Sequence, residues 1–241
     1  MAKIHMVLQG KGGVGKSFIS SVIAQYKSGN GQSPLCIDTD PVNATFAGYG
    51  ALGVRKLEIM EGDEINPRAF DAIVELASTA EGDVIIDNGA SSFVPLSHYL
   101  ISNEVPALLY EMGHTLVIHT VITGGQALRD TLNGFGQIVG QFPTPSTFVV
   151  WLNQYWGPIE HEGKGFEQLK VYRDHKDRVS AIVTIPATKE ATEGRDISEM
   201  LQARRTFDES LAMESLTIMT RQRLKIFKRK LFEQLDTAAV L

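Results

Sequence analysis

The chain has 241 residues, 43% of them hydrophobic, which fits one large domain over residues 1–241 in preference to two small ones. Its one cysteine, Cys36, excludes an intramolecular disulfide and suits a reducing cytoplasm. No apolar run reaches the roughly 18 residues that a transmembrane helix needs, so we expect a cytoplasmic protein without a leader segment. The six histidines form no HExxH or paired-cysteine pattern, so we also expect no zinc site. The net charge of −5 is unevenly spread, because one basic segment lies near the C-terminus.

Six short apolar runs along the chain predict β-strands. They are nearly continuous in Val, Ile and Leu, which is typical of parallel strands covered on both faces. Helical stretches separate them, so the pattern predicts an α/β fold, a mostly parallel twisted sheet with helices on both faces. The expected strands cover residues 3–9, 34–38, 83–87, 116–122, 148–153 and 179–186. The expected helices cover residues 16–27, 66–79, 92–111, 124–140, 164–176, 189–204 and 208–236.

The sequence GKGGVGKS, residues 10–17, lies between the first expected strand and the first expected helix. It fits the phosphate-binding pattern GxxxxGK[ST], in which glycines let backbone N–H groups wrap a phosphate at a helix N-terminus. In this loop Lys16 would reach the β and γ phosphates, and Ser17 would bind Mg²⁺. A glycine-rich turn without a ligand is the alternative. The predicted phosphate-binding residues are Gly10, Lys11, Gly12, Gly13, Val14, Gly15, Lys16, Ser17 and Phe18.

Aspartates end two later strands of the predicted sheet. Asp38 and Asp40 lie in IDTDP, and Asp87 ends DVIID. Ligands bind at the carboxyl edge of open α/β sheets, so we expect these carboxylates beside the phosphates. Asp40 would hold Mg²⁺ through water or orient the attacking water, with helix capping as the alternative. Asp87 resembles a Walker B aspartate, so the predicted metal site comprises Ser17, Asp38, Asp40 and Asp87.

Residues at the ends of the last two strands are candidates for binding the nucleotide base. The guanine-reading tetrapeptide Asn-Lys-x-Asp does not occur in the sequence, so ATP is favoured over GTP. The Asn153 amide can donate to and accept from an adenine edge, and Pro186 could line the same pocket. Both are also ordinary residues of strand-end turns. The adjacent loop 155–167 is a candidate nucleotide lid or partner-docking surface.

The segment KGGVGKS, with Lys11 ahead of the usual lysine, is identified as the deviant Walker A signature of the MinD/ParA ATPases, and DTDP, DVIIDNG and Asn153 resemble that family as well. The segments DTDPVNATF, DNGASSFVPLSHYLIS and WGPIEHEGK resemble more narrowly the conjugal transfer ATPases of broad-host-range plasmids. The resemblance implies a P-loop ATPase that binds ATP and Mg²⁺, forms a homodimer on ATP, and hydrolyses it slowly under stimulation by a partner. It also implies a role in conjugal DNA transfer with other proteins of the conjugation machinery.

In the MinD/ParA family the early lysine crosses the dimer interface to the phosphates of the other subunit. The resemblance gives Lys11 that role and makes Lys11, Lys16 and Asp40 the predicted catalytic residues. The sequence departs from the family at Val42 and Asn43, where many relatives read glutamine after Asp-Pro, and at Asn88 after the Walker B strand. These departures bear on the hydrolysis rate, and the alternative is an adaptor that holds ATP without hydrolysing it.

The C-terminal stretch is basic, because residues 220–232 contain six Lys or Arg and no acid. A helix over 208–236 would place four apolar side chains on one face: Leu224, Phe227, Leu231 and Leu235. Three alternatives are open here. The helix packs on the sheet with a solvated basic face, or it binds a membrane surface like the amphipathic tail of MinD, or it binds DNA or an acidic protein.

Overall fold

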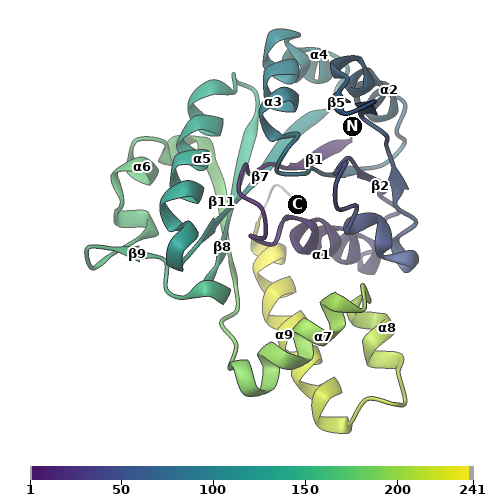
Figure 1. The fold of residues 1–241 in the computed structure, drawn as a ribbon, viewed down its shortest axis with the longest axis vertical. Helices are drawn as coiled ribbons and strands as arrows, with labels where there is room; N and C mark the ends of the chain where they lie inside the picture. The colour runs from purple at the N-terminus through teal and green to yellow at the C-terminus, as the bar shows by residue number, and fades with distance from the viewer. Residues whose placement is uncertain (1, 239–241) are drawn as a thin grey trace.

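The computed structural model, which describes residues 2–238, has a seven-stranded sheet at its centre (Figure 1). Its strands lie in the order β11-β8-β7-β1-β6-β2-β3, and neighbours pair in parallel throughout. The predicted parallel α/β sheet is therefore confirmed, and the short β3 adds a strand that was not expected. The strands are β1 (Lys3–Val7), β2 (Leu35–Asp38), β3 (Arg55–Lys56), β6 (Val84–Asp87), β7 (Thr115–Thr123), β8 (Thr147–Asn153) and β11 (Val179–Ile185).

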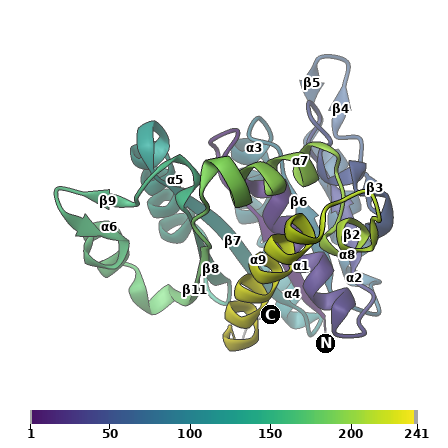
Figure 2. The same ribbon diagram turned by 90° about the horizontal axis from the view of Figure 1, so that it is seen from below.

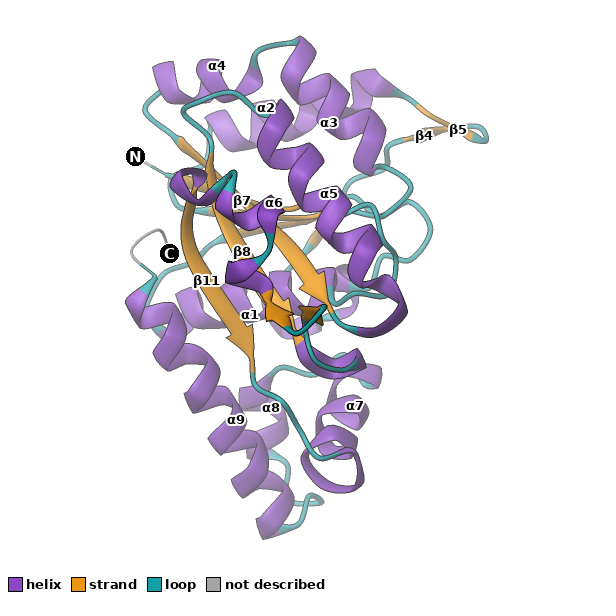
Figure 3. Ribbon diagram, turned by 90° about the vertical axis from the view of Figure 1, so that its left-hand side faces the viewer, coloured by secondary structure: helices purple, strands orange, loops and turns teal. Residues whose placement is uncertain are grey.

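Helices cover both faces of this sheet (Figure 3). One face packs against α2 (Asp71–Ser78), α3 (Phe93–Ser102), α4 (Val105–Glu111) and α5 (Leu128–Gln141). The other packs against α1 (Lys16–Gly29), α7 (Arg195–Gln202), α8 (Phe207–Ala212) and α9 (Ile218–Thr237). In β1, Ile4 and Met6 join the first core and Val7 joins the second. Both sides of each strand are thus buried, which is why the apolar runs are continuous.

Two short hairpins project from the body (Figure 2): β4 (Met60–Glu61) with β5 (Glu64–Ile65), and β9 (Glu160–His161) with β10 (Lys164–Gly165). The second hairpin shows that the helix expected over 164–176 is wrong, because only α6 (Lys170–Arg173) is α-helical there. Gly163, with φ of 72°, makes the left-handed turn of the hairpin, and Gly165 follows it in β10. A residue in this left-handed conformation cannot be part of a right-handed α-helix, so the chain turns back as a hairpin at the position where the helix was expected to begin.

The helix expected over 92–111 is divided into α3 and α4. Glu104 has φ of 51°, outside the helical region, and Pro106 lies in the first turn of α4. Proline has no N–H to donate to the preceding turn, so it is tolerated at the start of a helix but not in the middle. The expected helix 189–204 likewise begins with a π-helical turn at Glu190–Gly194 before α7.

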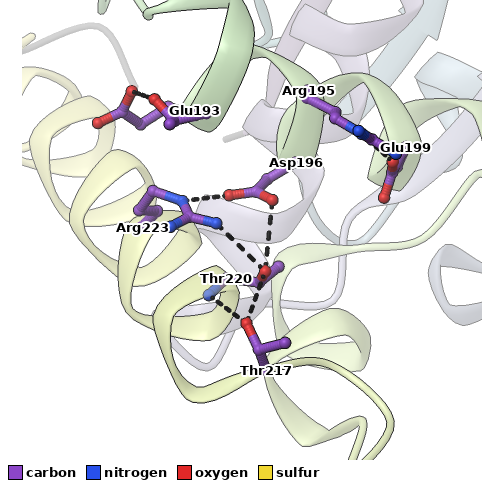
Figure 4. Close-up of polar contacts among 8 residues, drawn as sticks. Glu193, Arg195, Asp196, Glu199, Thr217, Thr220 and Arg223 are labelled. Carbon is purple, nitrogen blue, oxygen red and sulfur yellow. Dashed lines mark hydrogen bonds and ion pairs between the residues drawn. The ribbon is translucent and has the colours of Figure 1, made fainter.

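The helix expected over 208–236 is also divided, into α8 and α9. Thr217 caps the new helix, since its hydroxyl accepts from the N–H of Thr220 at 3.1 Å. Arg223 of α9 donates from Nε to Asp196 of α7 at 2.5 Å, and Thr220 Oγ1 reaches the other carboxylate oxygen (Figure 4). These contacts fasten α9 to α7. The four apolar side chains of α9 are buried in the second core: Leu224, Phe227, Leu231 and Leu235.

The structure therefore favours the first of the three alternatives for the basic segment, a terminal helix packed on the sheet. Its apolar face lies inside the protein and is not free to enter a membrane in this conformation. Lys228 pairs with Asp208. Within residues 2–238, three other bases of α9 form no ion pair: Arg221, Lys225 and Lys230. No helix in the described part of the chain is both long and apolar enough to cross a bilayer.

A chain of polar side chains runs through the buried sheet. Trp151 Nε1 donates to His119 Nδ1 at 2.9 Å, and His119 Nε2 lies 3.0 Å from His5 Nδ1. An indole N–H can only donate, so His119 accepts at Nδ1 and carries its proton on Nε2. His119 then donates to His5, whose own proton lies on Nε2, 4.0 Å from Asp83 Oδ2. Both imidazoles are neutral in this arrangement.

Acid should destabilise the fold through these two histidines. Burial lowers the pKa of His119 to about 3 and the pKa of His5 well below its ordinary value. In the unfolded chain both titrate at about 6.5, so below that pH these two sites bind more protons in the unfolded state than in the folded state. Their contribution to stability is fully present above pH of about 6.5 and is lost as the pH drops toward the folded pKa. We expect the two histidines to lower the free energy of unfolding by about 1–3 kcal/mol between pH of about 7.5 and 5.5, while the buried carboxyl of Asp87, whose pKa is raised to about 7, acts in the opposite direction.

Urea denaturation at a series of pH values measures this slope. His119→Gln should flatten it by removing one titrating group, whereas the exposed His98→Gln should leave it unchanged. Equal slopes in the wild type and His119→Gln would show that the buried pair does not govern acid sensitivity.

Candidate functional site

The glycine-rich loop of residues 9–15 joins β1 to α1 at the carboxyl edge of the sheet. Gly13 and Gly15 have φ of 73° and 101°, left-handed values that glycine adopts without strain. The helix α1 begins at Lys16, and its first N–H groups have no partner within the helix. The loop therefore combines free backbone donors with the positive end of a helix dipole, a geometry that binds phosphate.

The two lysines of the loop lie in different surroundings. Lys16 is buried, with 8% of its surface exposed, and its Nζ donates to the carbonyl of Lys11 at 3.0 Å. Burial lowers the pKa of Lys16, against the opposing effect of Asp87 and Asp40. The Lys11 side chain is 45% exposed and points to α5, where its Nζ lies 2.7 Å from Asp130 Oδ2. One ammonium thus faces into the loop and the other faces outward.

Asp87, at the end of β6, lies beneath the start of α1. It is buried, and burial raises its pKa to about 7 although hydrogen bonds from Ser17 and Ser20 oppose the shift. Ser20 Oγ donates to Asp87 Oδ1 at 2.9 Å. The structure therefore brings the predicted residues Ser17 and Asp87 together. Ser20 was missed, although its position one helical turn after Lys16 places it on the same face of α1.

Asp38 and Asp40 are largely occupied by backbone donors. Asp38 pairs with Asp87 in the register of β2 and β6, and it accepts from Asp40 N at 2.9 Å and from Ala47 N at 2.8 Å. Burial raises the pKa of Asp38. Asp40 Oδ1 accepts from the N–H groups of residues 42 and 43, so it caps a turn, not a helix. A Cβ on Gly89 would lie 2.7 Å from that oxygen, so glycine is needed there.

A magnesium ion fits best between Ser17 and Asp87. Their hydroxyl and carboxylate oxygens are the hard donors that Mg²⁺ prefers. Asp38 accepts a backbone N–H at each of its oxygens, whereas both backbone donors of Asp40 reach Oδ1. Of the four predicted metal residues, Ser17 and Asp87 are hydrogen-bonded to each other. Asp38 is the register partner of Asp87 on the neighbouring strand, and Asp40 follows Asp38 by two residues.

Asn153 and Pro186 lie at adjacent strand ends, as the sequence predicts, because Ile185 of β11 is the register partner of Asn153. Asn153 Nδ2 donates to the Val14 carbonyl at 2.9 Å, and its Oδ1 accepts from Tyr155 N at 3.1 Å. These bonds use one of the two N–H groups and one of the two oxygen lone pairs, so each polar atom of the amide keeps a further hydrogen-bonding position. The amide holds the loop against the end of β8.

Two exposed aromatic residues, Tyr155 and Trp156, begin the loop 155–167 that the sequence singled out beside Asn153. Their rings meet edge to face with centroids 4.7 Å apart. A Cβ on Gly124 or Gly125 would collide with the backbone of residues 156–158, so this turn is packed tightly against the end of β7. The adjacent glycines are the sequence signal for this packing, because glycines at a strand end indicate close approach of another backbone segment.

Known proteins resemble this chain in sequence and in fold. The family described as CobQ/CobB/MinD/ParA nucleotide binding domain matches residues 5–228. Two Escherichia coli proteins, each called Protein TraL, are 74% and 73% identical to it over the full length of both chains. A chain of a MinC:MinD cell division protein complex from Aquifex aeolicus matches with TM-score 0.54 and 14% identity, covering 96% of each chain. A putative plasmid partition protein from Borrelia burgdorferi B31, bound to AMPPNP, matches with TM-score 0.52 and 14% identity, covering 98% of this chain and 99% of that one. At this identity the two structures show the shared fold.

Proposed function

Because the chain belongs to the CobQ/CobB/MinD/ParA family of nucleotide-binding domains, we propose that it is an ATP-dependent switch that dimerises on ATP and assists plasmid conjugal transfer. Its close similarity to the TraL proteins supports the conjugal role. The similarity in fold to a partition protein bound to AMPPNP supports an adenine nucleotide as the ligand. In this role the protein acts in the cytoplasm and recruits or positions other transfer proteins.

One observation carries the proposal: the two lysines of the loop point in different directions, Lys16 into the loop and Lys11 toward Asp130 of α5. Lys16 is buried and exchanges the Lys11 carbonyl for a phosphate oxygen of its own nucleotide, since an ionised acceptor forms the stronger hydrogen bond. The side chain of Lys11 points outward from the loop and is half exposed, where a second molecule can reach it. A lysine that served only its own nucleotide would have no need of that position.

The remaining site residues bind, orient and hold charge. Backbone N–H groups of residues 12–17 wrap the phosphates, and Ser17 with Asp87 holds Mg²⁺, which would neutralise the phosphate charge. Ser20 fixes the Asp87 carboxylate. Asp40 orients the attacking water through Oδ2, while Oδ1 keeps its place in the turn that it caps. We therefore expect slow hydrolysis that a partner accelerates.

A second candidate is an adaptor that holds ATP without hydrolysing it. The engaged state of Asp40 favours it, because two backbone N–H groups hold one oxygen of this carboxylate in a turn. Such an adaptor would act through the unpaired bases of α9 on DNA, a membrane surface or an acidic protein.

Sedimentation velocity and phosphate release test the proposal. We expect a monomer without nucleotide or with ADP and Mg²⁺, and a dimer with a non-hydrolysable ATP analogue and Mg²⁺. Slow phosphate release that rises when other transfer proteins are added would support the switch over the adaptor. A protein that binds the analogue tightly and stays monomeric would contradict the switch.

A further inference from the structure

The outward lysine of the loop is bound to its own chain. Lys11 Nζ lies 2.7 Å from Asp130 Oδ2, 119 residues away on α5. Asp130 is in the first turn of that helix, where the positive end of the helix dipole favours a carboxylate. Both side chains are about half exposed, 45% for Lys11 and 55% for Asp130, so the pair is accessible to a competing anion.

The helix that carries Asp130 is packed directly against the loop. Gln9 Nε2 donates to the carbonyls of Val121 at 3.0 Å and Thr131 at 3.2 Å. A Cβ on Gly134 would overlap the Gln9 side-chain oxygen, so α5 approaches the loop closely. The loop is therefore held to α5 at residue 9 and again at residue 11. The ion pair therefore lies in a packed contact between the loop and α5, where the backbone positions of both residues are fixed.

An anion that approaches Lys11 must also approach Asp130. The pair forms one wall of a hollow of about 260 Å³, which Gly10, Phe93 and Asn133 also line. A triphosphate entering there would meet the ammonium that attracts it and the carboxylate that repels it. The carboxylate already satisfies the ammonium, so it competes with the incoming phosphate for the same charge.

We propose that Asp130 is a positioning residue that keeps Lys11 on its own chain until a triphosphate bound by a second copy displaces it. This rests on the proposed function, because it concerns the dimer that ATP is expected to form. The nucleotide of the same subunit assists the release. When Lys16 turns to that nucleotide, it gives up the Lys11 carbonyl, and the loop loses one of the bonds that fix Lys11.

Asp130→Asn keeps the shape of the side chain and removes its charge. The dimer formed with a non-hydrolysable ATP analogue and Mg²⁺ should become roughly threefold to thirtyfold tighter, because two symmetric pairs are removed and an exposed ion pair is worth at most about fivefold. The gain should shrink as salt rises, since the pair is screened. Asp130→Glu, which can still reach Lys11, should dimerise like the wild type.

The dimer dissociation constant is measured by sedimentation velocity over a range of protein concentrations. Glu111→Gln, an exposed neutralisation at the end of α4, is the matched control for net charge and should change nothing. In a Lys11→Ala background, Asp130→Asn should have no effect if Asp130 acts through Lys11. A dimer that is equally tight or weaker in Asp130→Asn would overturn the proposal, as would an equal effect in the Lys11→Ala background.

A second measurement does not depend on the dimer. The wild type and Asp130→Asn are treated with a limiting amine-acetylating ester, and acetylation at each lysine is quantified by mass spectrometry. Lys11 should react several-fold faster in the variant, with the exposed Lys164 as internal standard. Unchanged labelling would show that Asp130 does not hold Lys11. Faster labelling in proteins that both stay monomeric with the ATP analogue would instead reject the dimer, and with it the displacement step.

Discussion

Replacing Lys11 by alanine is expected to leave ATP binding within a few-fold of the wild type and to weaken ATP-dependent dimerisation by roughly a thousandfold. A symmetric dimer contains two such lysines, each reaching the phosphates of the other subunit. Charge-assisted hydrogen bonds from both would contribute about 4 kcal/mol, and each 1.4 kcal/mol is about tenfold in an equilibrium constant. The Lys11 side chain points away from its own loop toward α5, so its removal should change the affinity for the nucleotide of the same subunit very little.

Isothermal titration calorimetry with a non-hydrolysable ATP analogue measures nucleotide binding, and sedimentation velocity measures dimerisation. Lys16→Ala is the contrasting variant, since its side chain is buried in the loop and its loss should abolish nucleotide binding itself. Arg129→Ala, an exposed base next to Asp130 on α5, is the matched control and should behave like the wild type. A Lys11→Ala protein that dimerises normally on the analogue would exclude the crossing-lysine role.

The ion pair between Lys27 and Asp83 should matter most for stability. Lys27 Nζ lies 2.5 Å from Asp83 Oδ2, and the two side chains are only 1% and 16% exposed. Lys27→Met would keep the length of the side chain and leave a nearly buried carboxylate without this partner. Breaking one half of a buried pair typically costs about 3–5 kcal/mol. We expect about 3 kcal/mol, because the charge of Lys3 also acts on Asp83.

Urea denaturation at neutral pH measures this loss. Lys164→Met, on the exposed β10, is the control for replacing a lysine by methionine and should change the free energy of unfolding by less than about 0.5 kcal/mol. Adding Asp83→Asn to Lys27→Met should recover part of the loss, since the unpaired charge is then removed. A loss below about 1 kcal/mol in Lys27→Met would show that water or Lys3 compensates Asp83 fully.

Local patterns predicted the sheet well and the helices less well. The apolar runs that became β1, β2, β6, β7, β8 and β11 were each found within a few residues, because burial on both faces leaves a continuous signal. The helix boundaries at Glu104 and Thr217 were missed. A helix can break wherever one residue leaves the helical region, and periodicity averaged over a long window hides that.

The candidate site divides in the same way. The glycines of the loop, Lys16, Ser17 and Asp87 follow from a motif in which spacing alone carries the chemistry. Their partners do not. Ser20 on Asp87, Asn153 on the Val14 carbonyl and Asp130 on Lys11 join elements that no local pattern connects.

The sequence by itself determined that this protein has a phosphate-binding loop between a strand and a helix, because glycine conformation, helix polarity and residue spacing are local properties. The tertiary structure alone decided that Lys11 rests on Asp130, that Asp40 caps a turn, and that the apolar face of α9 is buried in the core. These facts depend on which strands lie side by side. Strand order is set by the packing of the whole chain. Lys11 can therefore pair with Asp130, 119 residues away, although no local sequence pattern predicts that contact.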